Sequence, residues 1–186
     1  LSPGGNMSLK STSYYNLTMN KASSGTMVTP AGPIVVTNAL TLTQGTFVAG
    51  AYTHQVAGSW DSSLVSVVLT MAGSTIQTTS AGPNITTKAG DQFNNLTITN
   101  GAVLQSAVSV GGVATVSGGT LQTNGHALTV GGDLTGAGAV TASGAEVVTV
   151  GGNFSFAGTF TAASSTVTLS PGGNMSLKST SYYNLT

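Results

Sequence analysis

The sequence has no cysteine and very little charge, and both absences exclude classes of function. Without cysteine, the chain can form neither disulfides nor thiolate metal sites. Only 4% of the 186 residues are charged, whereas about 25% is typical of a globular domain. Four lysines and no arginine cannot neutralise a run of phosphates, so we expect no nucleic-acid partner. An uncharged polar surface is typical of extracellular and cell-surface proteins, and this is the location we expect.

Long apolar runs and helix signals are also missing. No apolar run reaches the roughly 18 residues that a membrane span needs, so we expect no membrane insertion. Glycine and β-branched residues recur every few positions, and no capped amphipathic run reaches about ten residues. The hydrophobic content of 40% is still enough to form a core. The sequence therefore predicts an all-β protein.

What the chain does contain is repetition. The segment LSPGGNMSLKSTSYYNLT occurs at Leu1–Thr18 and again, without any change, at Leu169–Thr186. This identity predicts a tandem array, in which 1–168 is one unit and 169–186 begins the next identical unit. Within the unit, FNNLT at 93–97 resembles YYNLT at 14–18 and at 182–186. These spacings predict two half-repeats, at about 14–92 and 93–181.

A second, much shorter period predicts the fold. Val-Gly-Gly occurs at 110, 130 and 150, and the segments that begin at Val36 and Val56 have a similar pattern. A fixed period near 20 is typical of solenoids, in which each winding of the chain, here called a rung, stacks on the next. We predict a right-handed parallel β-helix with about 20 residues per rung and roughly eight rungs per unit. The alternative, a tandem array of Ig-like sandwiches, does not account for the period.

Two rows of residues follow from aligning these segments. The position two after each valine holds only glycine or asparagine, which predicts left-handed structural corners at Asn38, Gly58, Gly112, Gly132 and Gly152. Two residues further on, the alignment predicts one interior stack, made of Leu40, Trp60, Ala114, Leu134 and Phe154.

Three segments carry a resemblance to a known class of protein. FNNLTI, GTLQTNGHALTVGGDL and GTFTAASSTVTLSPGGNMSL resemble the degenerate repeats of very large bacterial surface and secreted proteins. Such proteins are similar in architecture to the filamentous-haemagglutinin and autotransporter-type adhesins. The resemblance implies a stalk, an adhesin or an extracellular fibre. Residues 64–76 and 80–91 fit the repeat poorly, which predicts an irregular rung or a protrusion there.

The polar residues do not suggest catalysis or cofactor binding. The four carboxylates, Asp61, Asp91, Asp133 and Glu146, are expected on different rungs, whereas glycoside cleavage commonly uses two that lie close together. Asp133 falls in a corner position, where a turn residue is expected. Metal sites need clustered donors, and none accompany the two histidines. His54 is expected in the core, satisfied by backbone groups, and His126 on a turn. We therefore expect no enzyme, no metal site and no cofactor.

These observations predict a structural subunit or segment of an extracellular fibre built from stacked repeats. Its expected partners are further copies of itself, joined in one covalent tandem array or end to end, with lateral bundling. The alternative is an adhesin stalk that binds a surface or a glycan, through the shaft or through residues 64–91. The possible junction between units is marked by Tyr14, Tyr15, Tyr182 and Tyr183.

Overall fold

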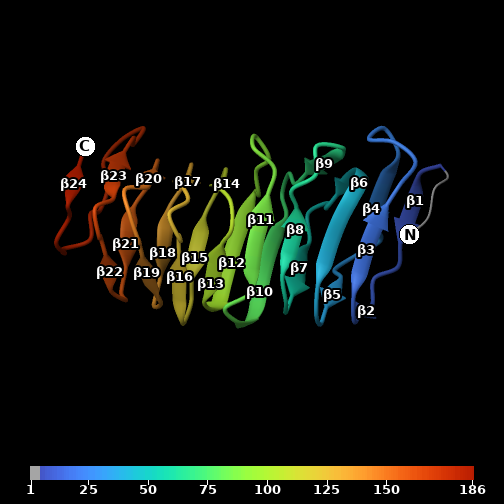
Figure 1. Ribbon diagram of the computed structural model, residues 1–186, viewed down its shortest axis with the longest axis horizontal. Coiled ribbons are helices and arrows are strands. Elements are labelled where there is room, and N and C mark those ends of the chain that lie inside the picture. Colours follow the sequence, from blue (N-terminus) through green and yellow to red (C-terminus); the bar gives the residue numbers. More distant parts are fainter. Residues whose placement is uncertain (1–4) are drawn as a thin grey trace.

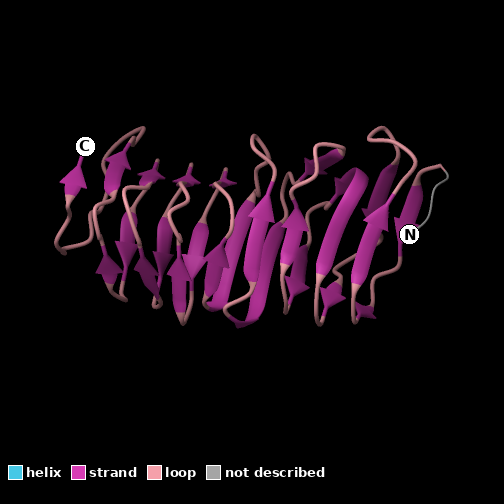
Figure 2. Cartoon of the chain, in the orientation of Figure 1, coloured by secondary structure: helices cyan, strands magenta, loops and turns pink. Residues whose placement is uncertain are grey.

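The computed structural model describes residues 5–186 as an elongated coil of parallel strands. Within these residues there is no helix, and the coil makes about nine turns (Figures 1 and 2). Strands of neighbouring rungs pair in parallel about 20 residues apart, for example Ala114 with Leu134 and Leu134 with Phe154. The prediction of an all-β parallel solenoid is confirmed, and the facing antiparallel sheets of a sandwich are excluded.

Each rung crosses three faces of the coil in a fixed order. Face 1 is an eight-stranded sheet. Its strands, in spatial order, are β2 (Ser13–Tyr14), β5 (Val35–Val36), β7 (Thr53–Val56), β10 (Thr75–Ala81), β12 (Asn95–Asn100), β15 (Ala114–Val116), β18 (Leu134–Gly136) and β21 (Phe154–Phe156).

Face 2 follows face 1 along the chain in every rung. Its strands are β3 (Leu17–Asn20), the first part of β6 (Leu40–Val48), β8 (Trp60–Ser62), β11 (Asn84–Thr87), β13 (Ala102–Leu104), β16 (Thr120–Gln122), β19 (Ala139–Thr141) and β22 (Phe160–Thr161). Strand β6 bends at Gly45, whose φ is 105°, and its second part continues onto face 3. This bend joins two faces into one 11-stranded sheet.

Face 3 closes the rung and has two parts, and most of its strands lie in the upper half of Figure 1. The first part contains β1 (Met7–Leu9), β4 (Met27–Pro30), the end of β6 and β9 (Val67–Thr70). The second part is a five-stranded sheet of β14 (Val108–Val110), β17 (Leu128–Val130), β20 (Val147–Val150), β23 (Thr166–Leu169) and β24 (Asn184–Leu185). Between the two parts, Phe93 alone forms a bridge, to Val110.

The strands are short and alternate between buried and exposed residues, because each has one face toward the interior. On face 1 the inward residues stack into continuous columns. One column contains Ile34, His54, Ile76, Leu96, Ala114, Leu134 and Phe154. No rung could bury its apolar side chains alone, so the core exists only because rungs stack.

The predicted interior stack is buried, but it is two columns and not one. Leu40 and Trp60 pair on face 2, whereas Ala114, Leu134 and Phe154 follow one another on face 1. The reason is that the sequence pattern matches Val56, which lies on face 1, with Val110, which lies on face 3. These two valines are 54 residues apart, which is not a whole number of 20-residue rungs, whereas His54 and Ala114 of one face 1 column are 60 residues and three rungs apart.

The predicted left-handed corners are also wrong in their conformation. Asn38, Gly58, Gly112, Gly132 and Gly152 do lie between strands, but none has φ in the left-handed region. At these glycines the backbone of one rung lies directly against the next. A Cβ on Gly132 would lie 2.7 Å from the Gly112 carbonyl oxygen, and one on Gly58 would lie 2.0 Å from that of Asn38. Glycine is needed there because of close stacking, not because of backbone handedness.

Replacing Thr78 with valine is expected to stabilise the protein by about 1 kcal/mol. Thr78 is buried between Val56 and Ile98, and its hydroxyl has no hydrogen-bond partner. Valine has the same shape and removes the desolvated hydroxyl. Urea denaturation measures the change. Thr123→Val is the matched control and should destabilise, because the Thr123 hydroxyl donates to Glu146; stabilisation by both variants would contradict the interpretation.

Candidate functional site

The four carboxylates are dispersed along the coil, and each has a local structural partner. Asp61 accepts hydrogen bonds from the backbone N–H and the hydroxyl of Ser63, at 3.0 and 2.7 Å. Asp133 accepts from the backbone N–H of Asn153 at 2.6 Å, which confirms its predicted place in a corner. Among residues 5–186, no three histidine or acidic side chains form a group that could hold a metal ion.

Glu146 is the most buried carboxylate and holds a turn together. It accepts from the N–H groups of Ser143 and Gly144, each at 2.7 Å, and from the Thr123 hydroxyl one rung below. Burial alone would raise its pKa, but these hydrogen bonds outweigh that effect and hold the pKa of Glu146 below its usual range. Because these donors come from its own turn and from the neighbouring rung, the Glu146 carboxylate links two rungs by hydrogen bonds.

His54 is the one imidazole of the described core, as predicted. Its Nδ1 accepts from the Ile34 N–H at 3.2 Å, so the proton resides on Nε2, which donates to the Ala49 carbonyl at 2.8 Å. Burial is the main influence on this side chain and lowers the pKa of His54, although the hydrogen bond to Ala49 acts in the opposite direction. His126 instead follows the turn at Asn124 and Gly125, both of which have positive φ.

The depressed pKa of His54 predicts a loss of stability in mild acid. The unfolded chain takes up a proton near pH 6.5, before the folded protein does, so stability should fall as pH drops below that value. Protonation would also place an N–H on Nδ1 against the Ile34 N–H. Thermal denaturation between pH 7.5 and 5 measures the slope, which His54→Gln should flatten and His126→Gln should leave intact. An unchanged slope in His54→Gln would contradict the assignment.

A cavity of about 340 Å³ opens on face 3, in the region predicted to be irregular. It lies between β9 and β14, where face 3 has no regular strand. Its lining includes Leu69, Met71, Asp91 and Phe93. Asp91 forms an ion pair with Lys88, with 3.4 Å between Nζ and Oδ1, while its Oδ2 is buried without a partner. Burial raises the pKa of Asp91, and the neighbouring Lys88 partly counteracts this.

A ladder of polar corner residues was not foreseen in the sequence. The side-chain oxygens of Asn95, Asp133 and Asn153 each accept the backbone N–H of a corner residue in the next rung, at 2.6–2.9 Å. Asn16 does the same for Ala39, at 3.2 Å. The signal is an asparagine or aspartate directly before an inward leucine or phenylalanine. These side chains join rungs where the backbone leaves one sheet and enters the next.

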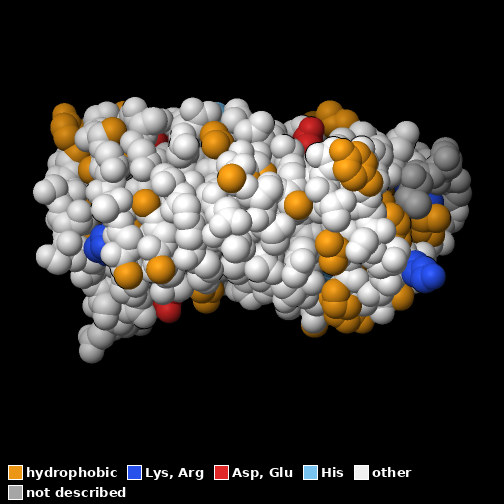
Figure 3. Space-filling model, turned by 90° about the horizontal axis from the view of Figure 1, so that it is seen from below, with side chains coloured by type: hydrophobic (Ala, Val, Ile, Leu, Met, Phe, Trp, Pro, Cys, Tyr) orange, Lys and Arg blue, Asp and Glu red, His pale blue; other side chains and the backbone are white. Residues whose placement is uncertain are grey.

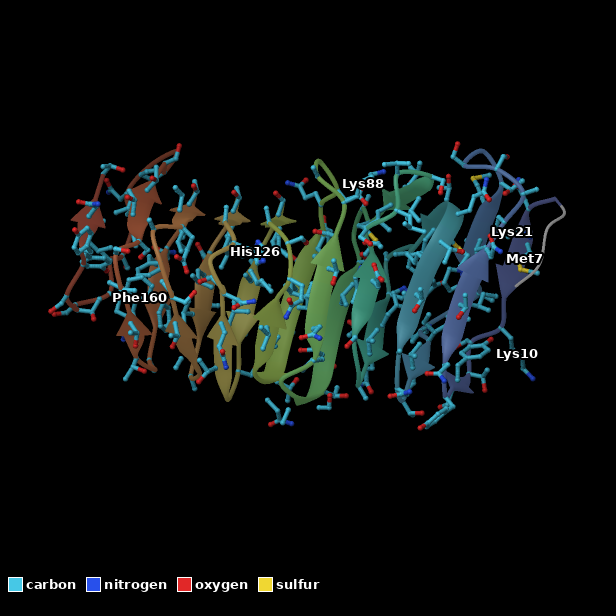
Figure 4. All side chains as sticks on the ribbon, viewed as in Figure 1. Met7, Lys10, Lys21, Lys88, His126 and Phe160 are labelled. Carbon is cyan, nitrogen blue, oxygen red and sulfur yellow. The ribbon has the colours of Figure 1, made fainter. Side chains whose placement is uncertain are left out.

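The surface offers few charged groups. The view in Figure 3 shows scattered charges among uncharged polar surface. The labelled lysines Lys10, Lys21 and Lys88 lie well apart in Figure 4, and Lys21 is buried.

No segment of residues 5–186 is a helix long and apolar enough to cross a membrane. Comparison of the chain with protein-family models, with curated proteins and with solved structures gave no match. The functional conclusion therefore depends on the geometry of the coil itself.

Proposed function

We propose that the chain is a structural segment of an extracellular fibre made of stacked solenoid units. The observation that carries this proposal is that the start of the second sequence copy continues the coil. Leu177 bridges to Phe154, and β24 pairs with β23, so residues 170–186 form the next rung. A further unit would add rungs by the same hydrogen bonds, without a separate docking surface. The partners in this proposal are further copies of the unit, and no catalytic activity or cofactor is assigned.

The geometry supports stiffness as the mechanical property of such a fibre. Each rung is bound to its neighbours on three faces, and the aromatic side chains of different rungs pack together in the core. Between ring centroids, Phe154 lies 6.0 Å from Tyr182 of the next rung and 5.4 Å from Phe160 of its own rung. Bending would have to stretch hydrogen bonds on one face. Because the chain has almost no charge, neighbouring shafts would not repel one another electrostatically, and this favours lateral bundling.

Electron microscopy of proteins with one, two and three tandem units tests the proposal. At about 4.8 Å per rung, each unit should add roughly 40 Å to a rod of constant width. Rods that lengthen by this step support the fibre. Compact particles whose width grows with the number of units would overturn it.

The cavity on face 3 favours one second candidate, an adhesin stalk. Its open side and the unpaired Oδ2 of Asp91 would suit a small hydroxylated ligand such as a sugar. A glycan array tests this idea: binding that Asp91→Asn and Phe93→Ala both abolish, and Asp61→Asn does not, would support it. No bound glycan would count against it and leave the fibre proposal unchanged.

A further inference from the structure

The two copies of the 18-residue segment lie on different faces of the coil. In the first copy, Leu9 belongs to β1 on face 3 and pairs with Pro30. Its counterpart Leu177 pairs with Phe154 on face 1. Likewise Leu17 belongs to β3 on face 2, whereas its counterpart Leu185 belongs to β24 on face 3. Every paired position of the second copy is thus displaced by one face in the direction of the chain.

The local conformation of the segment is nevertheless retained in part. The Tyr14 hydroxyl donates to the Lys10 carbonyl at 2.9 Å, and the Tyr182 hydroxyl donates to the Lys178 carbonyl at 2.6 Å. The following tyrosine is exposed in both copies, by 72% at Tyr15 and 65% at Tyr183. The difference between the copies is therefore mainly one of position around the coil.

A third related segment shows that the faces are interchangeable. The motif Asn-Leu-Thr occurs in the described chain at Asn16, Asn95 and Asn184, and the leucine after each lies on face 2, face 1 and face 3 respectively. All three faces require the same features: an inward apolar residue flanked by outward polar ones. In two of the three places the asparagine oxygen also accepts the N–H of the next rung. The motif therefore fits wherever the chain length places it.

The offset has a definite size. Along face 3, eight steps lead from β1 to β23, through β4, β6, β9, Phe93, β14, β17 and β20. One further face leads from β23 to Leu177, the counterpart of Leu9 in β1. The 168 residues from Leu9 to Leu177 thus span eight rungs and one of the three faces, which is eight and one-third rungs. The average is about 20.2 residues per rung, in keeping with the 20-residue steps between paired residues on face 1.

We propose that successive 168-residue units in the fibre are each rotated by one face, about a third of a turn, about the shaft axis. This inference rests on the proposed tandem fibre and specifies its symmetry. Three units contain 25 rungs, so the original orientation returns after about 120 Å. The exposed tyrosine at Tyr15 and Tyr183, and the cavity beside Asp91, then appear on the three sides of the shaft in turn. A shaft of this kind contacts neighbouring shafts on all sides and has no single adhesive side.

Paired cysteines in the 186-residue chain test the rotation directly, since the protein has no cysteine of its own. In the structure Asn184 lies beside Thr166 of β23 on face 3. If the second copy instead lay on the same faces as the first, Asn184 would extend the face 2 column that begins at Asn16. The last residue of that column is Thr161 of β22, so Asn184 would then lie beside Thr161. Neighbouring strands are about 4.8 Å apart, which is within the Cα separation that a disulfide spans.

Three double variants are oxidised with copper phenanthroline and compared by peptide mapping. Thr129→Cys with Thr149→Cys is the control for the chemistry, because these residues pair within the regular region. Thr166→Cys with Asn184→Cys should form a disulfide as fast as the control, and Thr161→Cys with Asn184→Cys should form less than a tenth as much. A disulfide between positions 161 and 184 instead would overturn the rotation and leave the fibre proposal standing. Reaction of the control alone would overturn both, because the second copy would then not continue the coil.

Discussion

Replacing Gly151 with alanine is expected to lower the free energy of unfolding by about 3 kcal/mol. A Cβ on this residue would lie 2.3 Å from the carbonyl oxygen of Gly131 and 3.0 Å from its carbonyl carbon. Both atoms belong to the backbone, so no side-chain rotation relieves the contact. Relief would require the two rungs to separate, and the hydrogen bond from the Gly151 N–H to the Val130 carbonyl, 2.8 Å long, resists this.

The same contact recurs down the corner, so the effect should be periodic. A Cβ on Gly131 would lie 2.5 Å from the Gly111 carbonyl oxygen. Gly111 is less constrained, because the atom nearest to its Cβ would be a side-chain oxygen of Gln92, which can rotate away. Alanine at 131 should therefore be about as harmful as at 151, and alanine at 111 clearly less so.

Gly173→Ala is the matched control for this series. Gly173 is exposed, its φ is not positive, and a Cβ there would meet nothing within 4 Å. Its replacement should change stability by less than about 0.5 kcal/mol. Urea denaturation of the four variants measures the differences. Equal stability of Gly151→Ala and Gly173→Ala would show that the rungs are not in contact at this corner.

The Val-Gly-Gly period was sufficient to predict the fold, because a solenoid places chemically equivalent residues at equal intervals. It did not reveal why glycine is there. Glycine at positions 112, 132 and 152 has two possible explanations, because a left-handed φ and a close approach of two backbones both favour a residue without Cβ. Only the distance between rungs distinguishes the two causes, and the distances favour close approach.

Position around the coil was the other feature that the sequence concealed. Trp60 and Phe154 looked like members of one row because the segments that begin at Val56 and Val150 are similar, although Val56 lies on face 1 and Val150 lies on face 3. The same local motif can follow a loop of any length. The face on which a motif lies therefore depends on the number of residues before it, and not on the residues that it contains. A warning was present, because neither the interval from Val56 to Val110 nor the length of the tandem unit is a whole number of 20-residue steps. Of the polar residues, the buried His54 was predictable from its inward position, whereas the partners of Glu146 were not, since one of them comes from another rung.

Replacing Phe154 with alanine is expected to cost about 4 kcal/mol and to loosen the second sequence copy in particular. The Phe154 side chain is fully buried, and its ring packs edge-to-face against Phe156 and Phe160, with centroids 5.2 and 5.4 Å away. It also contacts Tyr182 of the second copy. Alanine would leave a large cavity beneath the last rung. The backbone N–H of Lys178, which donates to the Phe154 carbonyl at 2.6 Å, should therefore exchange with solvent faster.

Trp60→Ala separates this local effect from a general loss of stability. Trp60 is equally buried and packs against Phe93 at 5.2 Å between ring centroids, but it lies five rungs from Phe154. Deleting either ring should cost a similar free energy. In a solenoid, however, stability is a sum of terms between neighbouring rungs, so the damage should remain near its origin. Hydrogen exchange should show faster exchange at Lys178 in Phe154→Ala and an unchanged rate there in Trp60→Ala. Equal acceleration in both variants would mean that the coil opens as one cooperative unit, and that its rungs do not act as the independent building blocks of a fibre.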